Sequence, residues 1–189
     1  MRFTSIFSIL LISILSSCIN NKNFSDFKLY SNDIATNKMI NQKFTFNKFG
    51  CNGDNISPQL SWVNPPKDTK SFAITIYDPD APTGSGWWHW MVLNIPKNYS
   101  KIDQNFITKN QFRFKNLITQ VRNDYGMYKY GGPCPPKTDK PHRYIFTIYA
   151  LKVDKLMIDK SATAAHAGFM INANMIAKSS FVAKYQNNQ

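Results

Sequence analysis

Two of the three histidines in this 189-residue chain lie beside proline-rich turns. His89 follows the prolines of residues 78–82, and His142 follows those of residues 131–136. Prolines restrict the backbone at strand ends, which builds a rigid pocket wall without a long loop. Within a strand, His142 and Tyr144 project from the same face. We therefore expect an imidazole and a phenol to meet one ligand at this position.

Short segments of alternating apolar residues predict the strands that carry these side chains. The pattern has period two and is interrupted by clusters of Asn, Asp, Gly and Pro, which is typical of an antiparallel sheet. The predicted strands are residues 71–77, 89–95 and 144–151, with shorter ones at 44–46 and 60–62.

Regular alternation along residues 89–95 assigns each side chain to one face of its strand. One face is expected to hold His89, Met91, Leu93 and Ile95, and the other Trp88, Trp90 and Val92. His89 would then lie among apolar neighbours.

A helix is predicted near the end of the chain. Residues 161–183 are rich in alanine and free of proline, with Phe169, Ala173 and Ile176 at helical spacing and Ser161 as the N-cap. Residues 97–136 show little periodicity and are expected to be mostly loop, where sites often lie. The fold class predicted is mainly β, with a C-terminal helix and few short helices.

The N-terminus carries a targeting signal. Residues 1–17 combine Arg2, an apolar run and small residues, the pattern of a secretory signal peptide. The run is too short for a transmembrane helix, which needs about 18 apolar residues. Residues 15–18 (Leu-Ser-Ser-Cys) match the site where bacterial lipoproteins are cut before a cysteine that is then lipidated. In the alternative, Cys18 is an apolar residue near an ordinary cleavage site.

The lipoprotein interpretation divides the chain into a signal peptide (1–17), a lipidated tether (18–27) and one domain (28–189). Ile19 stands where an aspartate would retain a lipoprotein in the inner membrane, so the bacterial outer membrane is favoured. Cys51 and Cys134 remain as an even pair in an oxidising compartment, which predicts a disulfide. Two buried thiols are the alternative.

The net charge of +12 does not indicate a nucleic-acid partner. The lysines are scattered, and the signal peptide directs the chain away from cytoplasmic nucleic acid. No Gly-x-Ser-x-Gly elbow, Walker loop or Gly-x-Gly-x-x-Gly fingerprint is present, so enzymatic activity is not expected. Cys134 could act as a thiol nucleophile only without the disulfide.

Several motifs in a fixed order resemble those of the phosphatidylethanolamine-binding protein family. They are residues 78–82 (Asp-Pro-Asp-Ala-Pro), 87–90 (Trp-Trp-His-Trp), 132–136 (Gly-Pro-Cys-Pro-Pro) and 142–144 (His-Arg-Tyr). Residues 55–62 also match the bacterial branch of this family, the Raf-kinase-inhibitor-like proteins. The resemblance spans about residues 49–185.

The resemblance implies an antiparallel β-sandwich with a small anion pocket at one end, without a cofactor, a metal or catalysis. By matching position, the implied pocket residues are Asp78, Asp80, Pro82, Trp87, His89, Gly132, Cys134, His142 and Tyr144. One of the two aspartates is expected to be structural, and Arg143 is expected to pair with a buried carboxylate. Thr138 stands where the family often has glycine, which leaves the shape of that loop open.

A phosphate headgroup suits these residue types. Imidazole, tyrosine and backbone N–H groups of the Gly-Pro turn donate to phosphate oxygens, and a carboxylate accepts from an ammonium. A nearby carboxylate is expected to raise the pKa of both His89 and His142, so binding should weaken when they lose their protons. The expected function is an envelope lipoprotein that binds a phospholipid headgroup or another phosphorylated anion.

A second class of function stays open from the sequence. The chain could be an interaction module that inhibits a protease or kinase or engages a host partner, with residues 97–131 as the candidate contact loop. The resemblance also leaves a homodimer open, although no apolar stripe demands one.

Replacing Cys18 with serine removes the thiol that would carry the lipid, so the variant is expected to leave the membrane fraction. Fractionation of cells that produce the wild type and Cys18→Ser tests this expectation. Membrane association that persists in the variant contradicts the anchor.

Overall fold

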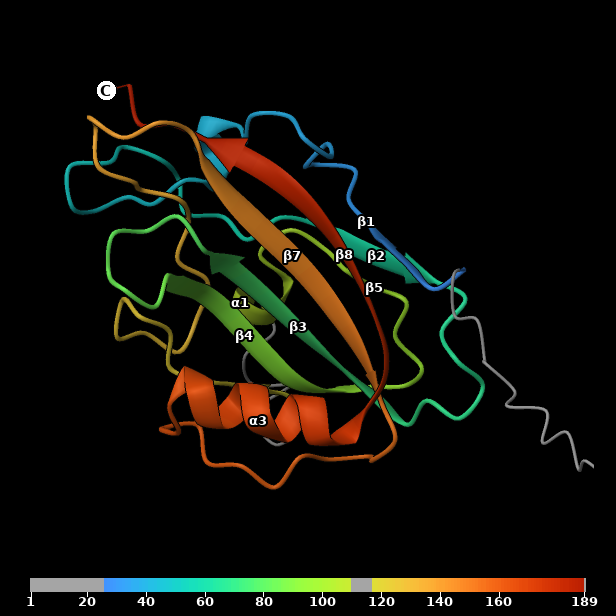
Figure 1. Cartoon of the computed structure of the whole chain (residues 1–189). Helices are drawn as coiled ribbons and strands as arrows, with labels where there is room; N and C mark the ends of the chain where they lie inside the picture. Colours follow the sequence, from blue (N-terminus) through green and yellow to red (C-terminus); the bar gives the residue numbers. More distant parts are fainter. Residues whose placement is uncertain (1–25, 110–116, 189) are drawn as a thin grey trace, which may run out of the picture.

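The computed structural model describes residues 26–109 and 117–188, in which β-strands dominate. The strands are β1 (Lys28–Tyr30), β2 (Leu60–Val63), β3 (Ser71–Asp78), β4 (Trp87–Pro96), β5 (Lys101–Ile102), β6 (Thr119–Gln120), β7 (His142–Leu151) and β8 (Met175–Tyr185). The helices are η1 (Gln42–Phe44), α1 (Phe106–Lys109) and α3 (Ala164–Asn174) (Figure 1). The strands form two antiparallel sheets, in the orders β6-β4-β3-β7-β8 and β1-β2-β5, which confirms the predicted mainly β fold.

The long strands of the larger sheet form where alternating apolar residues predict them. β-Branched and aromatic side chains suit the pleated surface. β3 lies between β4 and β7, so both of its edges are paired, and residues 71–76 are all buried. The predicted strands at 60–62, 71–77, 89–95 and 144–151 are confirmed, and β4 and β7 each begin two residues earlier than expected.

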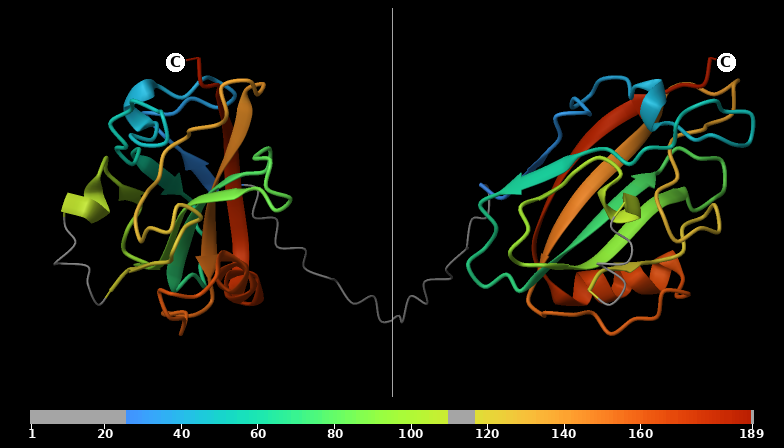
Figure 2. Two further views of the ribbon diagram at one scale, coloured as in Figure 1. Left: turned by 90° about the vertical axis from the view of Figure 1, so that its left-hand side faces the viewer. Right: turned by 180° about the vertical axis from the view of Figure 1, so that it is seen from behind.

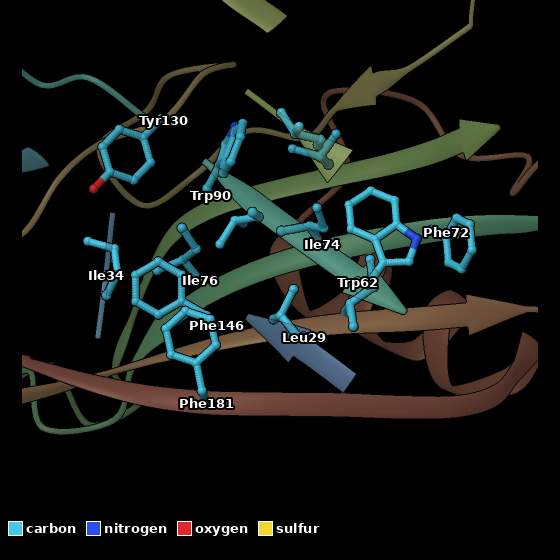
Figure 3. Close-up of a cluster of buried hydrophobic side chains, with 14 of the residues drawn as sticks. Leu29, Ile34, Trp62, Phe72, Ile74, Ile76, Trp90, Tyr130, Phe146 and Phe181 are labelled. Carbon is cyan, nitrogen blue, oxygen red and sulfur yellow. The ribbon is translucent and has the colours of Figure 1, made fainter. Parts of the chain in front are cut away.

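The main core lies between the two sheets (Figures 2 and 3). Leu29 and Trp62 of the smaller sheet belong to the same buried cluster as Ile74 and Phe146 of the larger sheet. On the other face of the larger sheet, a second cluster joins Ile171 of α3 to residues of β3, β4 and β7. The larger sheet is therefore covered on both faces, which leaves its end as the place for a site.

The predicted helix at 161–183 is wrong in both of its limits. The helix spans only Ala164–Asn174, with Thr163 as the N-cap, and β8 follows it directly. β8 pairs along its length with β7, and its buried residues Ala177, Phe181 and Ala183 lie at even spacing. Pairing with a neighbouring strand outweighs the helical propensity of the alanines. Phe169, at the helical spacing used for this prediction, is 68% exposed.

β4 does not alternate regularly between its two faces. Its register against β3 shifts near Asn94 and near His89. Each extra residue turns the following side chains to the other face. Leu93 therefore packs in the cluster beneath α3, whereas Ile95 joins the core between the sheets, and His89 contacts the inter-sheet residue Tyr144. The predicted common face for residues 89, 91, 93 and 95 is wrong for this reason.

Of two other predicted segments, a short strand and a long loop, only the loop agrees with the structure. Residues 44–46 do not form the expected strand, because the 3-10 turn η1 ends at Phe44 and an irregular loop follows. The described part of residues 97–136 is mostly irregular, as expected, with only β5, α1 and β6 in it.

The targeting segment lies outside the described residues, and so do Cys18 and most of the predicted tether. Phe27, at the end of that tether, is buried and stacks against Phe72. In the described part of the chain, no helix has the length and apolar character to cross a membrane.

Asn94 stabilises the irregular end of β4. Its side chain is 3% exposed, donates to Thr119 Oγ1 (3.1 Å) and the Leu156 carbonyl (3.3 Å), and accepts from the Leu156 N–H (2.7 Å). Asn94→Ala is expected to lower the free energy of unfolding by about 2–4 kcal/mol, because buried polar groups lose their partner and alanine disfavours the left-handed backbone. Urea unfolding measures the loss.

Asn64 supplies the matched control. It has a similar left-handed backbone (φ 53°, against 63° at Asn94) but is exposed. Asn64→Ala should therefore cost only about 1 kcal/mol. Equal losses for the two variants would contradict a role for the buried hydrogen bonds.

Candidate functional site

A cavity of about 190 Å³ opens at the end of the larger sheet, where β3 ends and β4 and β7 begin. Antiparallel neighbours place the end of one strand beside the start of the next, so Asp78, Trp87 and His142 come together. The predicted residues that line the cavity are Asp78, Pro82, Trp87, His89, Cys134, His142 and Tyr144. Asp80 and Gly132 are not among its lining residues.

His142, in the wall of the cavity, lies between two carboxylates. His142 Nδ1 lies 2.8 Å from Asp78 Oδ2, and His142 Nε2 lies 3.1 Å from Asp139 Oδ2. Asp78 Oδ1 also accepts from the Asp80 N–H (2.8 Å). Carboxylates only accept, so both ring nitrogens donate at once only in the imidazolium form. That form neutralises Asp78, and the carboxylate then does not repel an anion in the cavity.

Asp80 takes the structural role that one of the two aspartates was expected to have. Arg143 donates to it from Nη2 (2.6 Å) and Nε (2.9 Å), and from its own backbone N–H (2.8 Å). The hydrogen bonds from Arg143 lower the pKa of Asp80. Arg143 therefore pairs with a partly exposed carboxylate, and the expectation of a buried partner is wrong. The pair ties the turn after β3 to the start of β7.

Gly132 holds the loop behind the cavity and does not offer its backbone to a ligand. Its N–H donates to Asn55 Oδ1 (2.8 Å), and its carbonyl accepts from the Tyr125 hydroxyl (2.9 Å). A Cβ here would lie 2.2 Å from the Phe44 carbonyl oxygen, so only glycine fits. The expected donor from this Gly-Pro turn is already paired. Thr138, in the nearby turn, has no left-handed φ, so a side chain is accommodated there.

His89 differs from the expectation in its charge. Burial lowers its pKa to about 4, and this effect outweighs the nearby charge of Asp78, which acts in the opposite direction. The predicted rise in the pKa of His89 is therefore wrong. His89 Nδ1 lies 2.8 Å from the Gly131 carbonyl, which can only accept, so Nδ1 carries the proton of the neutral ring.

Three polar atoms in the cavity wall have no partner. They are Trp87 Nε1, His89 Nε2 and the Tyr144 hydroxyl, and the only other such buried side-chain atom in the described residues is Trp62 Nε1. His89 is 2% exposed and Tyr144 is fully buried. Burial raises the pKa of Tyr144, so its hydroxyl keeps its proton. An unsatisfied buried polar group costs about 1–3 kcal/mol, which a ligand with matching groups would recover.

Two aromatic side chains in the lining were not predicted. Tyr125 stacks on Phe46 with ring centroids 4.1 Å apart and meets His89 edge to face at 5.5 Å. Phe49 lies in the lining but is 76% exposed, which places it at the mouth. Neither residue lies in a periodic segment, so the sequence carried no signal for them.

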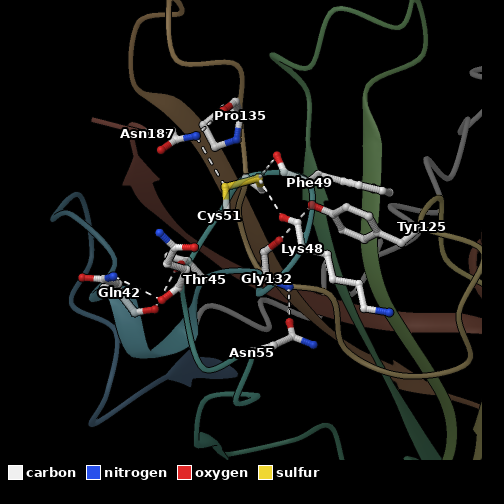
Figure 4. Close-up of a disulfide and its surroundings, with 12 residues drawn as sticks. Gln42, Thr45, Lys48, Phe49, Cys51, Asn55, Tyr125, Gly132, Pro135 and Asn187 are labelled. Carbon is white, nitrogen blue, oxygen red and sulfur yellow. Dashed lines mark hydrogen bonds between the residues drawn. A yellow bond between two sulfur atoms is a disulfide. The ribbon is translucent and has the colours of Figure 1, made fainter. Parts of the chain in front are cut away.

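The predicted disulfide between Cys51 and Cys134 is confirmed (Figure 4). Its two Cα atoms are 6.0 Å apart across a sequence separation of 83 residues. It joins the loop that carries Phe49 to the proline-rich loop on the other side of the mouth. Asn187 adds hydrogen bonds to the Pro135 carbonyl (3.3 Å) and Cys51 Sγ (3.4 Å). The rim is thus linked without regular secondary structure.

No metal site emerges from residues 26–109 and 117–188, in which no group of three or more His, Cys, Asp or Glu side chains could hold an ion. His142 and its two carboxylates are engaged with one another.

Residues 30–186 match the protein family described as phosphatidylethanolamine-binding protein. The chain belongs to this family. It is 44% identical to the UPF0098 protein YbcL of Escherichia coli (strain K12), covering 85% of this chain and 87% of that protein. It is 42% identical to YbhB of the same organism, covering 84% and 99%.

Solved structures of the family share the fold. The crystal structure of Escherichia coli YbcL, described as a new member of the mammalian PEBP family, gives a TM-score of 0.81 over 86% of this chain and 99% of that one. A homologue from Chlamydia trachomatis gives 0.71 at 28% identity, over 85% and 97%. The two-sheet architecture is therefore that of the family.

Removing the disulfide with Cys51→Ala/Cys134→Ala is expected to lower the free energy of unfolding by about 4 kcal/mol, because the unfolded chain regains the freedom of a long loop. Guanidinium unfolding under oxidising conditions measures the change. Asn187→Ala, which removes hydrogen bonds at the same rim, should cost about 1 kcal/mol. A double variant as stable as the wild type would contradict the prediction.

Proposed function

We propose that the cavity binds a small phosphorylated anion, such as a phosphoethanolamine-type headgroup. The observation that carries the proposal is the set of unpartnered polar atoms of Trp87, His89 and Tyr144 in a cavity of about 190 Å³. Sites for drug-sized ligands are typically about 300–1,000 Å³, so this cavity suits a smaller ligand.

The donors and charges of the cavity wall support binding of an anion. Trp87 and Tyr144, which line the cavity, carry an N–H and an O–H donor without a partner. An imidazolium at His142 would offset the buried charge of Asp78. Phosphate oxygens accept such hydrogen bonds without a metal. Membership of a family described as phosphatidylethanolamine-binding agrees with this chemistry.

Binding without turnover is part of the proposal. Cys134 is in a disulfide, so it cannot serve as the thiol nucleophile of the hydrolase alternative. The hydroxyl of Thr83 lies in the lining but bonds to the Gly86 carbonyl, which does not act as a base. No cofactor is invoked.

We also propose that the protein is a bacterial envelope lipoprotein of the Raf-kinase-inhibitor-like branch. The support is the signal-peptide-like pattern of residues 1–17 and the lipobox-like cysteine at position 18. A lipid at Cys18 would hold the domain at the membrane.

 Ile19, where an aspartate would retain a lipoprotein in the inner membrane, favours the outer membrane. Anchoring there would place the cavity within reach of lipid headgroups and soluble phosphates.

A protein partner is the second candidate function. The fold resembles that of a carboxypeptidase Y inhibitor solved in complex with its cognate proteinase, with a TM-score of 0.50 at 18% identity, which shows likeness of fold alone. Phe49, exposed at the cavity mouth, is the feature that favours a contact with another protein. A partner that docks there would cover the cavity, so bound anion and partner would compete.

Titration calorimetry of the full chain in detergent with phosphoethanolamine and with inorganic phosphate tests anion binding. The variant His89→Ala/His142→Ala is expected to bind at least about tenfold more weakly, because it loses two groups of the wall. His166→Ala, which alters an exposed histidine on α3, should bind like the wild type. A folded wild type that binds neither compound would sink the anion proposal and favour the protein partner.

A further inference from the structure

The unpartnered atoms of the cavity differ in hydrogen-bonding polarity. Trp87 Nε1–H can only donate, and the Tyr144 hydroxyl can donate. His89 Nε2 is an acceptor, because the proton of the neutral ring lies on Nδ1 and bonds to the Gly131 carbonyl at 2.8 Å. A ligand that satisfies all three atoms must therefore bring a donor as well as acceptors.

The groups around His89 do not supply that donor. Tyr144 of β7 meets the ring edge to face at 5.1 Å, and Tyr125 of the loop before β7 does so at 5.5 Å. Asp78 at the end of β3 raises the pKa of His89 and His142 at the start of β7 lowers it, but burial dominates and holds that pKa at about 4. The ring is therefore neutral above about pH 5, and Nε2 keeps its lone pair.

A phosphomonoester matches this arrangement and a phosphodiester does not. The monoanion of a monoester carries one P–OH group, which can donate to His89 Nε2 while its other oxygens accept from Trp87 and Tyr144. A diester or sulfate has only acceptors near neutral pH and would set a lone pair against that of His89.

We propose that the cavity selects phosphomonoesters and inorganic phosphate over phosphodiesters and sulfate, with the ligand's P–OH donating to His89 Nε2. The inference rests on the proposed anion binding and narrows it. Free phosphoethanolamine and a lipid with a terminal phosphate satisfy it. The intact headgroup of phosphatidylethanolamine, which is a diester, does not.

The proton requirement sets the pH dependence. Phosphomonoesters lose their second proton near pH 6. Affinity for methyl phosphate should therefore be flat from about pH 5 to 6 and fall about tenfold per pH unit at higher pH, because the dianion must regain a proton to bind. Dimethyl phosphate has no such proton, so it can bind well only after His89 itself is protonated.

Titration of the full chain with methyl phosphate, dimethyl phosphate and sulfate at about pH 5.5 is the test. Methyl phosphate is expected to bind at least about tenfold more tightly than the other two. Equal affinities overturn the selectivity while leaving anion binding intact. A folded protein that binds none of the three anions overturns the proposed function itself.

Two variants separate the acceptor from the donors. His89→Gln can present an amide N–H to the cavity, so the preference for the monoester and the pH slope should both shrink. Tyr144→Phe removes a donor that all three anions share, so it should weaken them in parallel and keep the preference. A preference that survives His89→Gln in full overturns the assignment to His89. If that variant does not fold, the comparison of ligands on the wild type still decides.

The monoester could be a soluble compound or a lipid, and a competition experiment distinguishes the sources. Vesicles of phosphatidylcholine with and without phosphatidic acid compete with labelled inorganic phosphate for the full chain. Displacement that requires phosphatidic acid supports a lipid monoester, and displacement by soluble methyl phosphate alone supports a soluble one. Phosphatidylcholine is a diester. If vesicles of phosphatidylcholine alone displace phosphate as effectively as vesicles with phosphatidic acid, the proposal is overturned.

Discussion

The buried contact between Asp78 and His142 is the interaction on which the site depends. It joins the last residue of β3 to the first residue of β7 at 2.8 Å, with both side chains almost fully buried. Removing charged groups from water is costly, and here the cost is offset because the Asp80 N–H and Asp139 supply further hydrogen bonds. On the outer side of the same turn, Asp80 holds Arg143. Two aspartates separated by one proline thus fix consecutive residues of β7 from opposite sides.

The rest of the cavity is built from rigid irregular chain. The disulfide, the prolines of residues 133–136 and the hydrogen bonds of Asn187 link loops that have no sheet pairing. Phe49 and Gly50 both have left-handed backbones, with φ of 56° and 83°. Such a conformation costs energy in phenylalanine and persists where the surroundings fix it, as the neighbouring disulfide does here. The mouth is consequently held in shape before any ligand arrives.

The sequence was a good guide where local pattern and final environment agree. The sequences of β3, β4 and β7 have alternating or continuous apolar residues, as a sheet covered on both faces requires. The motifs at the ends of these strands predicted residues that the fold brings together. β8 was missed because its alanines favour a helix locally, whereas its partner β7 is separated from it in sequence by a loop and α3. The shifts in β4 were missed because a single extra residue leaves no mark on composition.

Within the site, the residues that line the cavity were easier to predict than their protonation states and hydrogen-bond partners. His89 was expected in the pocket and lies in its lining, but its charge depends on burial and on the Gly131 carbonyl, which no spacing reveals. Tyr125 enters from an irregular segment by stacking on Phe46, a contact between residues that are distant in the chain. Gly132 was expected to donate its N–H to a ligand, yet Asn55 takes that bond.

The position of β8 bears on the order in which the molecule assembles. The N–H groups of Asn37 and Ile40, from the first part of the domain, bond to carbonyls of Val182 and Lys184, and the residues beyond β8 reach the proline-rich rim. Contacts between the two ends of a chain form late, because the entropy of closing such a long loop must be overcome first. The larger sheet can nucleate from its central hairpin, β3 and β4, but the mouth of the cavity closes only when the last residues of the chain have been delivered.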